Sequence, residues 1–115
     1  MPVKIAATFR NAFRGVGFMF EEPSIRFLAA ATVLTVCAGL YFSVSRLEWC
    51  ALLLAISLVW AAEGLNTALE RLTDLVSPDF HPLAGKAKDL AAGAVLLAST
   101  GAFLVGLFIF LSHLV

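Results

Sequence analysis

Long apolar runs separated by short polar segments occupy most of the chain. Three runs contain no charged side chain: residues 27–45, 49–62 and 90–112. A bilayer core needs about 20 apolar residues per helix, so the first and third runs span on their own, and the second spans if it continues past Glu63 to about Leu69. An open sheet is excluded because its edge groups would stay unsatisfied in lipid. The predicted transmembrane helices cover about residues 24–45, 48–75 and 83–112.

The N-terminal segment has a different pattern. Apolar residues recur there at helical spacing, whereas Arg10, Asn11 and Arg14 fall on the other side. This predicts an amphipathic helix over about residues 3–21, lying on the membrane surface and ending before Pro23, which suits the first turn of the next helix. The predicted fold class is therefore all-α: one integral membrane domain of three transmembrane helices preceded by an N-terminal amphipathic surface helix.

Composition strengthens the membrane interpretation. Hydrophobic residues make up 61% of the chain and charged residues 14%, far from an average soluble domain. Formal net charge is zero, so we expect no nucleic-acid partner. Cys37 and Cys50 lack the spacing of a zinc site and are interpreted as small apolar residues. The early basic residues interrupt any apolar core near the N-terminus, so no signal peptide is expected.

Lysines and arginines predict the orientation. Only Arg46 lies between the first and second apolar runs, whereas the other seven lie before the first run or between the second and third. Basic residues favour the cytoplasmic side. We therefore expect a multi-pass protein of the cytoplasmic (inner) membrane with its N-terminus in the cytoplasm, and no role is assigned to His113 on the far side.

A polar stripe interrupts the second span near its cytoplasmic end. At about 100° per residue, Asn66, Thr67, Glu70 and Asp74 all lie within about 60° of Glu63. Single polar residues in a membrane helix are commonly hydrogen-bonding contacts between helices. Three carboxylates on one face instead need a cation or a proton in a low dielectric, which favours a functional site in a polar cleft.

The other cytoplasmic helix ends add Glu21 or Glu22, Lys86, Lys88 and Asp89. Carboxylates can hold Mg²⁺ on nucleotide phosphates, lysine offsets phosphate charge, and a carboxylate can accept a proton from an attacking hydroxyl. The inventory therefore indicates phosphoryl transfer. Neither a Walker A loop nor a dinucleotide fingerprint is present. A rival hypothesis is a non-catalytic oligomeric membrane protein, or an ion pathway whose carboxylates bind cations.

Four segments resemble a known family. The sequences EGLNTALERLTD at 63–74 and HPLAGKAKDLAAGAVL at 81–96, with FRNAFRG at 9–15 and EEPSIRF at 21–27, are similar to the small bacterial integral-membrane diacylglycerol and undecaprenol kinases. The resemblance covers roughly residues 9–110. It implies a homotrimer whose active sites lie near the cytoplasmic interface and are shared between neighbouring subunits, with Mg²⁺ and ATP as cofactor and phosphoryl donor.

The resemblance also implies individual roles. Glu63 would be the general base on the lipid hydroxyl. Glu70 and Glu22 would hold the metal; Glu21 is the alternative to Glu22, because the segment from Arg14 is one residue shorter than the family pattern. The implied contacts to phosphate or nucleotide involve Asn66, Lys88, Asp89, Asp74 and His81, together with Arg10 and Arg14, which could equally be surface-helix anchors.

The acceptor is a lipid primary alcohol in either branch of the family. The pairs Glu48-Trp49 and Asp74-Leu75, and the segment at 81–84, resemble the undecaprenol kinases more than the diacylglycerol kinases. We therefore expect an ATP- and Mg²⁺-dependent kinase acting on undecaprenol. The alternative is a diacylglycerol kinase that makes phosphatidic acid.

Overall fold

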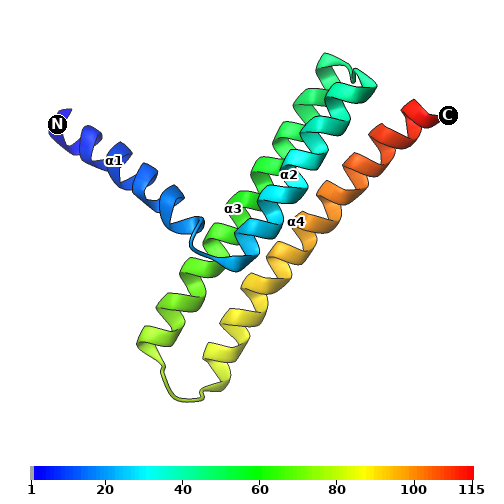
Figure 1. Ribbon diagram of the computed structural model, residues 1–115. Helices are drawn as coiled ribbons and strands as arrows, with labels where there is room; N and C mark the ends of the chain where they lie inside the picture. Colours follow the sequence, from blue (N-terminus) through cyan, green and yellow to red (C-terminus); the bar gives the residue numbers. More distant parts are fainter. Residues whose placement is uncertain (1) are drawn as a thin grey trace.

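Four helices make up the part of the chain that the computed structural model describes, residues 2–115 (Figure 1). They are α1 (Pro2–Met19), α2 (Pro23–Phe42), α3 (Arg46–Val76) and α4 (Pro82–Leu114). No strand occurs within residues 2–115, and α2, α3 and α4 are long and apolar enough to cross a membrane. The predicted all-α membrane fold class is confirmed.

The surface-helix candidate α1 points away from the other three helices, which run side by side (Figure 1). It ends at Met19, two residues before the expected end. Residues 20–22 close the turn with backbone bonds of the i to i−3 type, including Glu22 N–H to the Met19 carbonyl at 3.1 Å, and these tighten the chain before Pro23. Phe20 then packs against Trp60 of α3 in a tilted arrangement, with ring centroids 5.7 Å apart, so the chain just after α1 contacts α3.

The turn between α2 and α3 is closed by local capping. Ser43 ends α2 in the left-handed region with φ of 51°. Ser45 and Glu48 form a reciprocal capping box at the start of α3, which satisfies two backbone donors that a helix start otherwise leaves unpaired. Glu48 also contacts His113 of α4, with Oε1 3.0 Å from Nε2. His113 therefore ties the end of α4 to the start of α3.

The buried core is small and lies toward this end of the bundle. Val44, Leu52 and Ile109 form its centre. Most other large apolar side chains are exposed, among them Phe27 at 81% and Leu54 at 73%, and an apolar groove of about 670 Å³ lies between α2, α3 and α4. Apolar exposure on this scale needs lipid or other protein to cover it, as expected for membrane helices.

Gly39 provides a test of the α2–α3 packing. It is buried, and a Cβ atom there would lie 2.6 Å from Trp49 Cη2. Overpacking a core costs about 1–3 kcal/mol, so we expect Gly39→Ala to lower the midpoint of thermal unfolding in detergent. The matched control is Gly101→Ala in α4, because a Cβ there meets nothing within 4 Å. Equal midpoints for the two variants would contradict the packing seen here.

Candidate active site

The candidate site lies at the level where α2 begins, beyond which only α3 and α4 continue. The lower halves of α3 and α4 continue as an antiparallel hairpin past the start of α2, and α1 departs at the same level (Figure 1). Because α3 is one unbroken helix, Glu63 and Asp74 lie about 16 Å apart along its axis at about 1.5 Å per residue. The polar stripe therefore extends from the α2 level toward the loop at residues 77–81.

Glu63 marks the end of the stripe that borders α2. Its side chain is half-buried, and its Oε1 accepts a hydrogen bond of 2.8 Å from the Ser24 hydroxyl. The next residue, Gly64, faces Met19: a Cβ added there would lie 3.0 Å from Met19 Cε. The carboxylate thus lies beside the junction of α1, α2 and α3.

Asn66 and Glu70 form the middle of the stripe. Asn66 Nδ2 donates to Glu70 Oε1 at 3.4 Å, which is a long hydrogen bond. Asn66 Oδ1 is buried and finds no partner within residues 2–115. An unpaired buried acceptor costs about 1–3 kcal/mol, so a donor from outside this chain would be favourable at this point.

Glu22, rather than Glu21, reaches α3. Glu22 occupies the N-cap position of α2 without capping the helix through its side chain, and instead forms an ion pair with Arg71. Its neighbour Glu21 is exposed, whereas Glu22 is half-buried. The geometry therefore places Glu22 beside Arg71, the residue that follows Glu70 in α3.

An ion pair joins α3 and α4 at the end of the stripe that lies nearest the loop at residues 77–81. Lys88 Nζ of α4 lies 2.5 Å from Asp74 Oδ1 of α3. Both side chains remain substantially accessible, at 41% and 65%, so the pair can exchange partners with a charged ligand. Asp89, one residue further on, is exposed.

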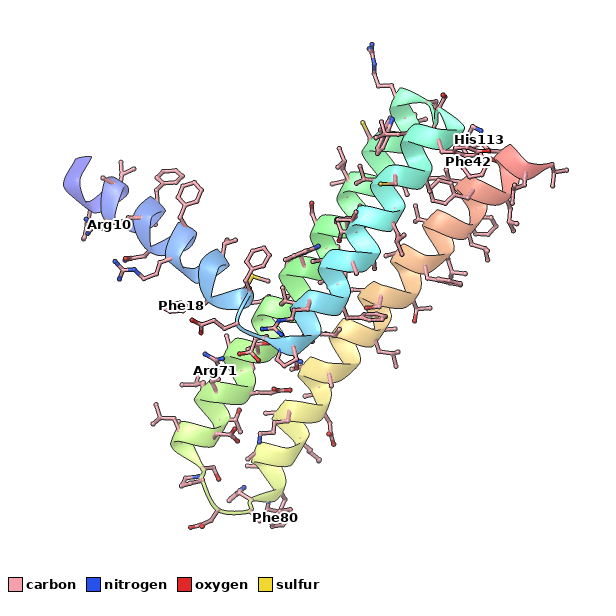
Figure 2. The ribbon with its side chains drawn as sticks, viewed as in Figure 1. Arg10, Phe18, Phe42, Arg71, Phe80 and His113 are labelled. Atoms are coloured by element: carbon pink, nitrogen blue, oxygen red, sulfur yellow. The ribbon has the colours of Figure 1, made fainter. Side chains whose placement is uncertain are left out.

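The remaining predicted residues lie outside this set of contacts. His81 is the N-cap of α4, where its Nδ1 accepts the Leu83 N–H at 3.1 Å. Arg10 and Arg14 are exposed on α1, and Figure 2 shows Arg10 well away from the hairpin that carries Arg71. In this arrangement His81 has a local structural role, and within the described residues neither α1 arginine forms an ion pair with a carboxylate.

The carboxylates of the site limit the kind of metal ion that it can hold. Within the described chain no group of three or more histidine, cysteine or carboxylate side chains gathers closely enough to hold a metal. Mg²⁺ is usually bound by one or two carboxylates, with water and substrate phosphates completing its shell. Glu22 and Glu70 are hard oxygen donors of this kind, so they fit Mg²⁺ that arrives with a nucleotide and do not fit a permanent all-protein metal site.

Sequence reasoning missed two residues that the structure brings into the site. Ser24 contacts Glu63, and Arg71 contacts Glu22, across 39 and 49 residues of sequence respectively. Ser24 lies within the EEPSIRF segment and Arg71 directly follows Glu70. Helical periodicity places residues on a face of one helix, but it does not give the register between two helices, so neither contact had a signal in the sequence.

Comparison with known proteins agrees with the resemblance drawn from the motifs. Residues 10–110 match the prokaryotic diacylglycerol kinase family. Undecaprenol kinase of Bacillus subtilis is 40% identical over 108 residues, 93% of this chain and 88% of that protein. Diacylglycerol kinases are also similar: that of Synechocystis is 38% identical over 89% of this chain and 59% of its own length, and that of Escherichia coli K12 is 30% identical over 81% and 76%. The match spans nearly all of the chain, which therefore belongs to the prokaryotic diacylglycerol kinase family of lipid kinases.

Proposed function

We propose that this lipid kinase transfers the γ-phosphate of ATP, with Mg²⁺, to the primary hydroxyl of undecaprenol. The observation that carries the proposal is the single polar stripe on α3. It begins at Glu63 beside the α2 start and reaches the Asp74–Lys88 pair on the hairpin, so it offers separate places for an acceptor hydroxyl and a charged donor. The high identity to a Bacillus subtilis undecaprenol kinase over most of both chains supports this acceptor.

Glu63 is the proposed general base. A hydroxyl attacks phosphorus more readily when a positioned carboxylate accepts its proton. Ser24 occupies Glu63 Oε1, which leaves Oε2 free for the acceptor hydroxyl. As the new oxygen–phosphorus bond forms, the bond from the γ-phosphorus to ADP breaks, and the hydroxyl proton passes to Glu63.

Glu22 and Glu70 are the proposed metal ligands. Metal bound there with ATP would neutralise phosphate charge during transfer. The proposed phosphate and nucleotide contacts on α3, α4 and the loop between them are Asn66, Asp74, His81, Lys88 and Asp89. Arg10 and Arg14 are further proposed nucleotide contacts, and they lie on α1, which points away from the other three helices (Figure 1). Arg71 currently balances Glu22 and Lys88 balances Asp74, so both carboxylates are held in place before the nucleotide binds.

We further propose a homotrimer with active sites shared between subunits, in the inner membrane with the N-terminus in the cytoplasm. The unpaired, buried Oδ1 of Asn66 supports a donor from outside the chain. The exposed apolar faces of α2, α3 and α4 are available for subunit contact. Seven of the eight lysines and arginines lie at the end that carries the stripe, which favours the cytoplasm for that end. Native mass spectrometry of the detergent-solubilised protein tests the trimer.

Transfer of labelled phosphate from [γ-³²P]ATP tests the acceptor. Pure protein in bilayers is supplied with undecaprenol, a shorter polyprenol or diacylglycerol, with and without Mg²⁺. We expect Mg²⁺-dependent labelling with the highest kcat/KM for undecaprenol. A higher kcat/KM for diacylglycerol would instead support synthesis of phosphatidic acid, as the similarity to diacylglycerol kinases allows. No labelled lipid from folded protein would refute the proposal.

A further inference from the structure

The first turn of α2 contributes a side chain to which the sequence motifs assign no role. Ser24 follows Pro23 in this turn, and its hydroxyl donates to Glu63 Oε1 at 2.8 Å. This length is typical of a good hydroxyl–oxygen hydrogen bond. Glu22 does not cap the helix through its side chain, so the turn directs both Glu22 and Ser24 toward α3.

A fixed carboxylate is a better base than a mobile one. Glutamate loses about 1.5–2 kcal/mol of side-chain conformational freedom when it is ordered, and reacting groups must approach within about 3–3.5 Å in an aligned geometry. The Ser24 hydroxyl orders Glu63 before the lipid arrives and engages only one of its two oxygens. Ser24 keeps its own proton throughout, so it acts on the reaction only through Glu63.

The alternative is that Ser24 merely helps to hold two helices together. A second hydrogen bond between the same helices provides the comparison: Trp60 Nε1 of α3 donates to Thr32 Oγ1 of α2 at 2.9 Å. Interhelical hydrogen bonds in membranes contribute about 0.6 kcal/mol on average, so both bonds are of similar value as helix contacts. Only the Ser24 bond reaches a carboxylate of the polar stripe.

We propose that Ser24 is a positioning residue for Glu63 in phosphoryl transfer to the lipid alcohol. The proposal rests on the proposed role of Glu63 as general base. The hydroxyl proton of the acceptor passes to Glu63 Oε2 while Ser24 holds Oε1. Loss of the Ser24 hydroxyl therefore affects the chemical step, and it leaves the proposed metal ligands Glu22 and Glu70 in place to bind the nucleotide.

Four variants in detergent or bilayers test this role: Ser24→Ala, Ser24→Thr, Thr32→Val and the double variant Ser24→Ala with Glu63→Gln. We expect Ser24→Ala to lower kcat about tenfold, the scale of about 1.4 kcal/mol, with an unchanged KM for Mg·ATP. Ser24→Thr retains the hydroxyl and should keep kcat within about twofold of wild type. Thr32→Val removes the other interhelical bond and should leave kcat unchanged.

The double variant separates positioning from general damage. Because Ser24 acts through Glu63, adding Ser24→Ala to Glu63→Gln should lower kcat no further, which is the non-additivity expected of coupled residues. Unchanged kcat in Ser24→Ala, an equal loss in Thr32→Val, or full additivity in the double variant would each overturn the positioning role. A wild-type protein without lipid kinase activity would overturn the proposed function instead, so the two failures are distinguishable.

Discussion

Replacement of Glu63 by glutamine is expected to lower kcat for lipid phosphorylation by about 10²–10⁴-fold, the usual contribution of a general base. Glutamine keeps the size of the side chain and can still accept the Ser24 hydrogen bond through its carbonyl oxygen. It cannot take a proton from the acceptor hydroxyl. Steady-state phosphate transfer gives kcat, and titration with a fluorescent ATP analogue gives nucleotide affinity, which we expect to stay near that of wild type.

Glu48→Gln is the matched control for Glu63→Gln. Glu48 is also a glutamate of α3, but it lies at the opposite end of the helix, where it contacts Ser45 and His113. Its replacement removes the same charge at a position remote from the polar stripe. The kcat per folded protein should therefore be unchanged. If Glu63→Gln keeps more than a tenth of wild-type kcat, Glu63 is not the general base.

Much of the fold follows from the apolar runs. Backbone groups in lipid must bond within their own segment, so uncharged stretches long enough to span must be helices, as α2 and α4 are. The polar end of α3 was predictable for a related reason. Glu63, Glu70 and Asp74 keep helical spacing, and no proline interrupts the chain between them or before Pro78, so the helix continues through the stripe to Val76.

The contacts between helices were not predictable in the same way. Whether Glu21 or Glu22 faces α3 depends on how the three-residue turn after Met19 closes, and its i to i−3 bonds have no distinct sequence signal. The pairing of Glu22 with Arg71 depends on the register between α2 and α3. His81 shows a further limit: its family motif pointed toward nucleotide, yet its position before Pro82 also makes it the cap of α4.

Replacement of Glu70 by glutamine is expected to act on binding, in contrast to Glu63→Gln. Glu70 accepts a hydrogen bond from Asn66, and the amide oxygen of glutamine can preserve it. The lost charge is what a hard cation requires. We expect the Mg²⁺ concentration for half-maximal rate and the KM for Mg·ATP to rise at least about tenfold, the scale seen when groups supporting a metal are removed, with kcat largely recovered at saturation.

Asp79→Asn is the control for Glu70→Gln because it removes one negative charge from the exposed loop between α3 and α4. If the effect at Glu70 came only from the overall field near the nucleotide, the two variants would weaken Mg·ATP binding alike. A metal ligand instead makes Glu70→Gln far more sensitive to Mg²⁺ concentration than Asp79→Asn. Direct titration of Mg·ATP into Glu63→Gln and Glu70→Gln completes the comparison. Only the metal ligand Glu70 is proposed to contact the Mg·ATP complex. Equal loss of Mg·ATP affinity in the two variants would therefore refute the assignment of Glu63 as the base and Glu70 as a metal ligand.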